Sequence, residues 1–252
     1  MKNTLRQLLA AGKPAVGTMV QIPSAPVVEV LAQAGFDWLV SDAEHGPIDI
    51  ESVHAMVRAT AGTAVTPTVR IPSNLDWLTK RVLDVGALGV MVPGVNSGQE
   101  AQAAVRAVRY PPQGTRGFGP TFAGLRWNLS GADYARQANG EVMAILQIEH
   151  ADAVARIDEI LAVPGVDVAL IGPYDLSGSM GLLGQVTHPD VQAAIGRVLK
   201  AAQKANVAAG IFGTSPEDIN RYIAQGFRAI LLGLDVGFLA AGAQSALAQV
   251  KR

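Results

Sequence analysis

Charged side chains stand directly after several short apolar runs of this sequence, and they are of types that bind cations or move protons. Glu149 closes the run AILQIE, and Asp175 lies in GPYD, which follows the run VDVALI. A carboxylate in apolar surroundings needs a cation, because an unpaired buried charge is costly. Two carboxylates with open positions for water and substrate are typical of Mg²⁺ or Mn²⁺ sites. A plain salt bridge between Glu149 and Arg70 is the competing interpretation.

A histidine and an arginine follow two earlier apolar runs. His45 comes after DWLVSD, with Asp42 and Glu44 close by in the chain. This pattern is typical of a general base oriented by a carboxylate, and a loop histidine that only caps a neighbour is the alternative. Arg70 ends the run VTPTVR. Its permanent charge suits it to clamp a carboxylate or to stabilise an enolate oxygen.

Lysine is missing from these positions. The six lysines lie at the termini or in predicted helices: Lys2, Lys13, Lys80, Lys200, Lys204 and Lys251. Imine chemistry needs a desolvated lysine in the site, so the sequence disfavours a Schiff-base mechanism. A carbanion would then have to be stabilised by a metal ion. There is also no G-x-S-x-G elbow and no Walker-type loop.

The elements that must position these side chains alternate regularly. Eight β-branched apolar runs predict strands at 15–20, 37–42, 65–70, 87–92, 142–149, 166–171, 207–212 and 228–232. Stretches of helical period predict helices at 25–34, 49–60, 74–85, 97–108, 151–162, 189–205, 215–225 and 236–249. Eight such repeats predict an α/β fold, a closed (β/α)₈ TIM barrel, in which the carboxyl ends of the strands converge. An open doubly wound sheet is the runner-up, but it usually carries a glycine-rich turn where this chain reads QIPSAP.

The joints between these elements repeat two local signals. Predicted helices end in glycine before a strand, as in LDVG and IAQG, which is typical of a left-handed helix end. Predicted helices begin after Asp49, Ser97 or Ser215, which are good N-cap residues. Both signals support the assigned helix boundaries.

We expect a single barrel domain over residues 1–252. One segment, 110–140, departs from the alternation, being long, rich in Gly and Pro, and aromatic. A loop of this length in a compact fold is usually functional or binds a partner. The alternative is an ordinary excursion that contains one short helix near 131–138.

Composition narrows the class of protein. The 252 residues are 49% hydrophobic and 16% charged with a net charge of −1, which excludes a disordered chain and gives no electrostatic footprint for nucleic acid. No apolar run is long enough to cross a membrane, and the start MKNTLRQLLAAGKPAVG lacks a signal peptide. Cysteine is absent, which suits a cytoplasmic protein.

Long segments resemble the HpcH/HpaI aldolase family. They are AGFDWLVSDAEHGPID, TVRIPSN, KRVLDVGALGVMVPGVNSGQEAQAAVRAVRYPPQGTRG, LQIEHADAV, VDVALIGPYDLSGSMG and HPDVQAAI. The resemblance covers essentially the whole chain. It implies a metal-dependent class II aldolase, a carbon–carbon lyase that adds the enolate of pyruvate or hydroxypyruvate reversibly to an aldehyde. In reverse such an enzyme cleaves 4-hydroxy-2-oxo acids.

The resemblance also implies roles for the residues singled out above. Glu149 and Asp175 would bind the divalent metal ion (Mg²⁺, Mn²⁺ or Co²⁺), which chelates the 2-oxo acid. Arg70 would stabilise the enolate oxygen. His45 would act as the base, directly or through a metal-bound water, helped by Asp42.

The resemblance also implies roles for residues to which the pattern of charged strand ends assigns no function. Asp84, in VLDVGA, would raise the basicity of the histidine. Gln147 and the backbone around Tyr174 would contact the oxo acid, although position 174 is often small in the family. The resemblance further implies a homotrimer, or a homohexamer built as a dimer of trimers, with the last helix exchanged between neighbours.

Two other functions remain open at this level. A citrate-lyase-like enzyme acting on a CoA ester would share the enolate chemistry. Such an enzyme needs a basic surface for the CoA phosphates, and the net charge of −1 and the scarcity of lysine near the site argue mildly against one. A non-catalytic barrel that binds a chelated oxo acid would also fit. Neither alternative predicts a nucleic-acid or membrane partner.

Overall fold

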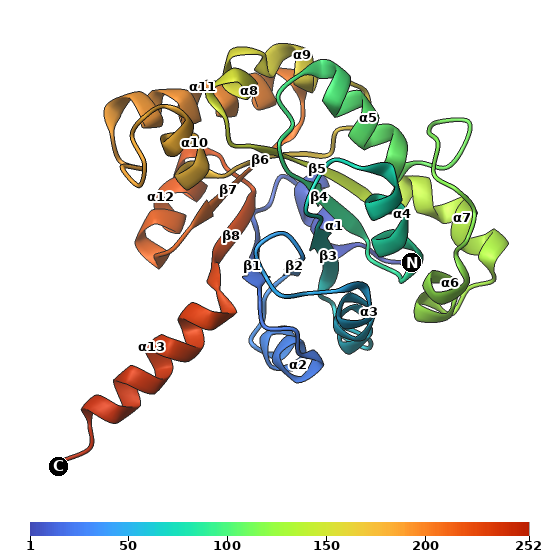
Figure 1. Ribbon diagram of the computed structural model, residues 1–252, viewed down its shortest axis with the longest axis horizontal. Coiled ribbons are helices and arrows are strands. Elements are labelled where there is room, and N and C mark those ends of the chain that lie inside the picture. The colour runs from blue at the N-terminus through green and yellow to red at the C-terminus, as the bar shows by residue number, and fades with distance from the viewer. Residues whose placement is uncertain (252) are drawn as a thin grey trace.

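The apolar runs form parallel strands that close into a barrel. The computed structural model describes residues 1–251, and each strand pairs with its neighbours in chain order until β8 meets β1 (Figure 1). The strands are β1 (Ala15–Val20), β2 (Trp38–Asp42), β3 (Thr66–Arg70), β4 (Gly89–Val92), β5 (Met143–Ile148), β6 (Val168–Ile171), β7 (Ala208–Gly213) and β8 (Ala229–Leu234). The predicted (β/α)₈ barrel and its eight strands are therefore confirmed.

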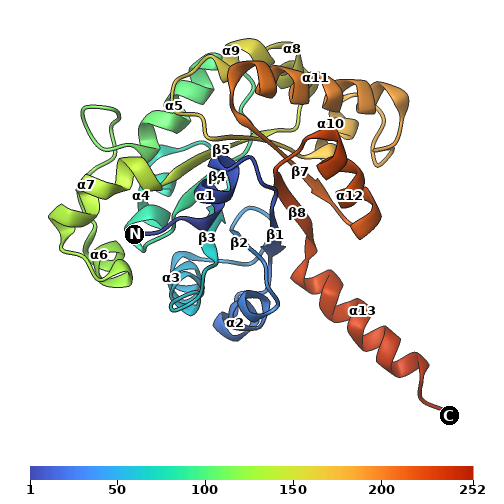
Figure 2. The same cartoon turned by 180° about the vertical axis from the view of Figure 1, so that it is seen from behind.

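The helices surround the barrel, as Figures 1 and 2 show from opposite sides. They are α1 (Thr4–Ala10), α2 (Ala25–Gln33), α3 (Ile50–Ala59), α4 (Asp76–Asp84), α5 (Gly98–Val108), α6 (Thr121–Trp127), α7 (Gly131–Glu141), α8 (Ala151–Ala155), α9 (Ile157–Leu161), α10 (Pro173–Ser179), α11 (Pro189–Ala205), α12 (Pro216–Gln225) and α13 (Asp235–Ala248). The helix predicted at 151–162 is in fact two short helices that break at Arg156. The helices α1, α6 and α10 were not predicted.

Helix ends follow the signals in the sequence. Gly86 and Gly226 have φ of +105° and +114°, a conformation that a Cβ atom disfavours, and each is followed closely by a strand. The side chains of Asp49, Ser97 and Ser215 accept hydrogen bonds from backbone N–H groups in the first turns of α3, α5 and α12.

Two apolar cores result. One fills the space between the strands and the helices, and the other fills the barrel interior with side chains such as Met19, Trp38 and Ile145. Helix α1 covers the amino end of the barrel, where Leu5 joins the interior core. Asn3 fixes that helix, because its amide donates to the carbonyl oxygens of Leu88 and Glu141.

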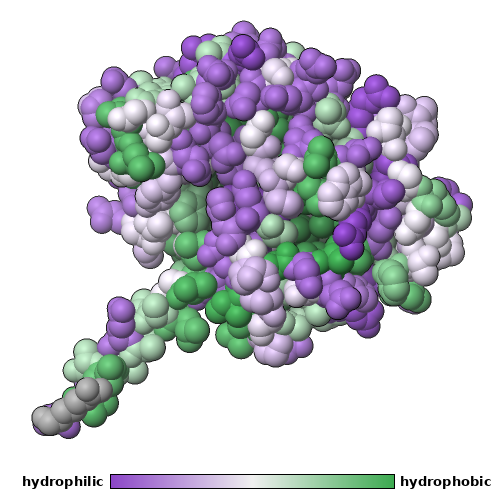
Figure 3. Space-filling view, in the orientation of Figure 1, coloured by the Kyte–Doolittle hydropathy of each residue, from purple (hydrophilic) through white to green (hydrophobic). Residues whose placement is uncertain are grey.

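The last helix does not pack along the barrel. Figures 1 and 2 show α13 projecting from the body, and Figure 3 shows apolar side chains along it. Val236, Leu239 and Leu247 are 47%, 66% and 53% exposed. A helix that is apolar yet exposed needs a surface to cover it. None of the helices within residues 1–251 is long and apolar enough to span a membrane.

The excursion at 110–140 lies at the amino end of the barrel. It follows α5, which runs back from the carboxyl ends of the strands, and it leads into the start of β5. Arg126 and Trp127 anchor it there by donating to the carbonyl oxygens of Val57 and Gly86. It therefore lies away from the strand ends of its own chain, and its functional role stays a prediction.

Close strand packing generates a first prediction. A methyl group at Gly17 would lie 2.6 Å from atoms of the fully buried Trp38 ring. Gly17→Ala should therefore lower the free energy of unfolding by about 1–3 kcal/mol in urea denaturation. Gly196→Ala is the matched control, because a methyl group there has open space in the middle of α11 and should stabilise by up to about 1 kcal/mol. Equal stability of Gly17→Ala and the parent protein would contradict this account.

Candidate active site

A cavity of about 180 Å³ opens at the carboxyl ends of the strands. Its lining includes most of the side chains selected from the sequence, namely His45, Arg70, Gln147, Tyr174 and Asp175. Asp42 and Glu149 lie directly behind this lining, because they contact Arg70 and Gln147. The convergence of the strand ends thus brings seven of the eight predicted site residues together, and Asp84 is the exception.

Strand register places Asp42 beside Arg70. The two residues are paired in the β2–β3 ladder, each at the last position of its strand. Arg70 Nε donates to Asp42 Oδ1 at 2.8 Å and Nη2 donates to Oδ2 at 2.7 Å, which is the strong bidentate geometry. Gln21 Nε2 also donates to Oδ2, at 2.8 Å. The backbone N–H groups of Glu44 and His45 point to Oδ1 at 3.2 and 3.3 Å.

These contacts control the ionisation of Asp42. Burial alone would raise the pKa of its carboxyl group, because burial disfavours the charged form. The hydrogen bonds and positive charge of Arg70, with the amide of Gln21 and the N–H of His45, nevertheless hold the pKa below its ordinary value. Asp42 is therefore a carboxylate at neutral pH, and its charge fixes the Arg70 guanidinium.

Glu44 is the carboxylate nearest to the His45 ring. Its Oε2 lies 4.0 Å from His45 Nε2 and 3.0 Å from Arg70 Nη1. The contact with Arg70 is an ion pair without the directionality of a hydrogen bond, since Oε2 has no hydrogen-bond partner among residues 1–251. Burial raises the pKa of Glu44, and Arg70 offsets only part of this rise. The His45 side chain is 58% exposed, and Asp42 contacts its backbone rather than its ring.

Glu149 is held by a backbone donor and a neighbouring amide. Gly94 N–H donates to Oε1 at 3.0 Å, and the Gln147 side-chain amide donates to Oε2. Burial raises the pKa of Glu149, the Gly94 N–H lowers it, and the negative charge of Asp175 raises it further. Arg70 forms its ion pairs with Asp42 and Glu44 instead, so the alternative of a Glu149–Arg70 salt bridge is wrong.

Asp175 lies in the first turn of α10, immediately after β6. The backbone at Gly172 passes close to the Glu149 side chain, since a Cβ atom on Gly172 would lie 3.3 Å from Glu149 Oε2. The carbonyl oxygen of the buried Gln147 side chain also has no hydrogen-bond partner in the described chain. The carboxylates of Glu149 and Asp175 supply oxygen donors, which fit a hard divalent cation.

The site offers few other ligands of that kind. Within residues 1–251 there is no cluster of three or more His, Cys, Asp or Glu side chains arranged to hold a metal. A cation held by Glu149 and Asp175 would therefore keep positions open for water and substrate, which is the arrangement of a catalytic rather than a structural metal site.

Asp84 lies at the other end of the barrel. It is the last residue of α4, which runs back toward the start of β4. Its carboxylate contacts Arg116 Nη2 at 2.8 Å, and the buried Arg116 guanidinium stacks on Tyr110 and hydrogen-bonds to Tyr134. Burial raises the pKa of Asp84, and Arg116 offsets part of that rise. Within one chain, Asp84 therefore does not reach His45.

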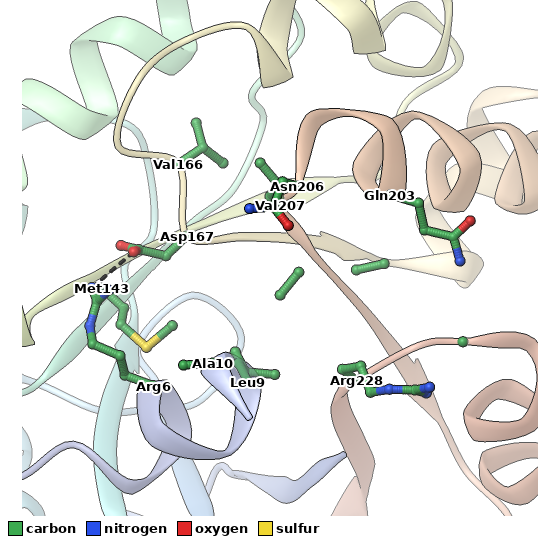
Figure 4. Close-up of a pocket in the computed structure, with 13 residues that line it drawn as sticks. Arg6, Leu9, Ala10, Met143, Val166, Asp167, Gln203, Asn206, Val207 and Arg228 are labelled. Carbon is green, nitrogen blue, oxygen red and sulfur yellow. Dashed lines mark hydrogen bonds and ion pairs between the residues drawn. The ribbon is translucent and has the colours of Figure 1, made fainter. Parts of the chain in front are cut away.

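A larger cavity of about 530 Å³ lies at this amino end, and its charges are already satisfied. Figure 4 shows Arg6 and Asp167 beside it, joined at 2.8 Å. The Arg228 guanidinium donates to three backbone carbonyl oxygens, those of Gly12, Ile223 and Phe227. This arrangement supports the fold and offers no pair of carboxylates for a cation.

Two contributors to the site were not selected from the sequence. Gln21 is the polar residue after β1, and the rule applied to the other strand ends would have found it. Gly94 contributes only its backbone N–H, which leaves no signature in a sequence.

Comparison with known proteins decides the family. The family described as HpcH/HpaI aldolase/citrate lyase matches residues 17–241. This chain belongs to that family. A hydroxypyruvate/pyruvate aldolase of Paraburkholderia phytofirmans is 39% identical over 255 residues, covering 99% of this chain and 98% of that protein. A 4-hydroxy-2-oxo-heptane-1,7-dioate aldolase of Shigella boydii is 39% identical, covering 99% and 95%.

Solved structures agree. The crystal structure of an HpcH/HpaI aldolase/citrate lyase family protein from Burkholderia cenocepacia superposes with a TM-score of 0.92 at 38% identity, covering 100% of both chains. The resemblance found in the sequence is confirmed, and the chain is an aldolase, a carbon–carbon lyase. HpcH/HpaI aldolases generally depend on a divalent metal ion.

The buried ion pair yields a prediction for stability. Asp42→Asn removes the charge that compensates Arg70, and breaking a buried pair in this way typically costs about 3–5 kcal/mol. Urea denaturation at pH 7 should show a loss of that order. Asp133→Asn is the control, because its ion pair with Arg136 is exposed on α7 and should change stability very little. A loss no larger than that of the control would contradict the assigned role of the pair.

The same variant predicts a pH dependence. The pKa of Asp42 is lower in the folded than in the unfolded chain, where it is about 4. The stabilisation is therefore complete above pH 4 and is lost as the pH falls through the folded value. The difference in unfolding free energy between the parent protein and Asp42→Asn should shrink below pH 4. A difference that stays constant down to pH 2 would exclude this linkage.

Proposed function

We propose that this aldolase forms the enolate of pyruvate or hydroxypyruvate with the help of a divalent cation and adds it reversibly to an aldehyde. The observation that carries the proposal is the pair Glu149 and Asp175, two carboxylates beside one cavity whose arginine is already paired. No lysine lines that cavity within the described chain, which supports a mechanism without an imine. The two relatives named above carry the corresponding activities in their names.

The cation would be Mg²⁺, Mn²⁺ or Co²⁺, held by Glu149 and Asp175. When bound, it supplies Lewis-acid stabilisation of the negative charge that develops on the 2-oxo acid. Gln147 positions Glu149 through its amide. Its free carbonyl oxygen is available to accept a hydrogen bond from the hydroxyl group of hydroxypyruvate.

His45 is the proposed base. Its imidazole lines the cavity, and the Glu44 carboxylate, 4.0 Å away, would stabilise the protonated ring. His45 takes a proton from C3 of the donor, C3 bonds to the aldehyde carbon, and the proton returns to the aldehyde oxygen. Arg70 donates two of its five N–H groups to Asp42 and forms an ion pair with Glu44, so N–H groups remain for the enolate oxygen.

The scarcity of basic side chains in the cavity argues against the alternative of a CoA-ester lyase. CoA phosphates require basic side chains, and Arg70 is the cation that lines the cavity. It is committed to Asp42 and Glu44.

The assembly belongs to the same proposal. The exposed apolar α13 favours a trimer or a dimer of trimers in which that helix packs on a neighbouring copy. The role that the family resemblance implies for Asp84 likewise requires a second copy, since Asp84 and His45 of one chain lie at opposite ends of the barrel.

Removal of the cation tests the proposal directly. Cleavage of a 4-hydroxy-2-oxo acid, followed by pyruvate release, should be abolished by EDTA and restored by Mg²⁺ or Mn²⁺. Glu149→Gln should lower kcat by at least about 100-fold, and Glu51→Gln on the exposed face of α3 should not. Full activity in EDTA would remove the cation from the mechanism.

Exchange of deuterium into the methyl group of pyruvate isolates the base. His45→Ala should lose this exchange by about 100-fold or more while Mn²⁺ affinity is retained. His54→Asn, on α3 against Phe122, is the matched control and should exchange normally. Undiminished exchange in His45→Ala would assign the base to another group.

A further inference from the structure

A chain of hydrogen bonds runs around the rim of the barrel and reaches the active-site arginine. Asp235 directly follows β8 and Gln21 directly follows β1, and the two lie close because β8 pairs with β1 where the barrel closes. Asp42 and Arg70 are the last residues of β2 and β3. Hydrogen bonds join the four residues in this order, so groups at four successive strand ends are connected.

The Asp235 carboxylate fixes the turn after β1. Asp235 is 4% exposed, and its Oδ1 and Oδ2 accept hydrogen bonds from the backbone N–H groups of Gln21 and Ile22, each at 2.9 Å. Oδ1 also accepts from the N–H group of Val236 at 2.8 Å, in the first turn of α13. Only the last of these bonds serves the start of the helix. The other two bind consecutive N–H groups of the turn and so orient the backbone at Gln21.

Gln21 connects this turn to the active site. Its Nε2 donates to Asp42 Oδ2 at 2.8 Å, and the same oxygen accepts from Arg70 Nη2. The backbone of Gln21 also packs on the turn that follows Asp42, since a Cβ atom on Gly46 would lie 3.1 Å from the Gln21 carbonyl oxygen. Bidentate pairing fixes a guanidinium relative to its carboxylate. The Gln21 amide therefore restrains Arg70 by restraining Asp42.

We propose that Asp235 and Gln21 are positioning residues for Arg70. Asp235 holds the turn after β1, Gln21 holds the Asp42 carboxylate, and Asp42 then presents the remaining N–H groups of Arg70 to the enolate oxygen. This inference rests on the proposed function, since it concerns the arginine that stabilises the enolate there. It places part of the support of the active site at the first residue of α13.

Gln21→Met tests the contact with Asp42, because methionine keeps the length of the side chain and removes the donor. In deuterium exchange into the methyl group of pyruvate, kcat should fall roughly tenfold while KM for pyruvate stays within about twofold, since Arg70 acts on charge that develops during the reaction. Gln192→Met is the matched control, because its Nε2 donates to the carbonyl oxygen of Val186 beside α11, and it should exchange like the parent protein. A kcat of Gln21→Met equal to that of the parent would overturn the inference.

A double-variant cycle tests whether Asp235 acts through Gln21. Asp235→Asn replaces one acceptor oxygen by an amide donor and should lower kcat by roughly threefold to tenfold. Gln21→Met/Asp235→Asn should be no slower than Gln21→Met alone, because the turn then has no donor to position. Asp49→Asn, at the N-cap of α3, controls for the loss of a helix-start carboxylate and should keep the parent kcat. Losses that multiply in the double variant, or an unchanged kcat in Asp235→Asn, would overturn the assignment of Asp235.

The parent protein separates the two levels of failure. Each kcat is divided by the number of Mn²⁺ sites measured by titration, so that unfolded protein does not count. If the parent exchanges the methyl protons and both single variants match it, the positioning inference alone is wrong. If the parent does not exchange in the presence of Mn²⁺, the proposed function fails and the positioning inference fails with it.

Discussion

Two negatively charged side chains after the adjacent strands β5 and β6 are the central constraint on the site. Glu149 follows β5 and Asp175 lies in the first turn of the helix after β6, and the negative charge of Asp175 raises the pKa of Glu149. Arg70 offsets little of this rise, because its guanidinium is paired with Asp42 and Glu44. A divalent cation would neutralise this charge, and the chemistry proposed for the site follows from such a cation.

The barrel creates this situation through strand register and through the residues that directly follow the strands. Pairing of Asp42 with Arg70 at the last step of the β2–β3 ladder locks the arginine in place. Gly94 and Gln147 then orient Glu149 from the ends of β4 and β5. The interior core, which Leu5 of α1 joins at the amino end of the barrel, packs between the strands that carry these residues.

Much of this was predictable from the sequence. Strand boundaries follow from the apolar runs, and charged residues at their ends identify Glu149, Asp175, Arg70 and His45. The choice of partner for Arg70 was not predictable, because it depends on strand register, which composition does not encode. The Gly94 N–H has no side-chain signature. Helix α1 is a short helix of seven residues. That it covers the amino end of the barrel becomes evident only when the barrel interior is known.

The most direct test of the central claim is anomalous diffraction from crystals grown with Mn²⁺ and pyruvate. This account predicts one strong Mn²⁺ peak within bonding distance of both the Glu149 and Asp175 carboxylates, with pyruvate beside it. A peak elsewhere, or carboxylates turned apart with an arginine between them, would contradict it.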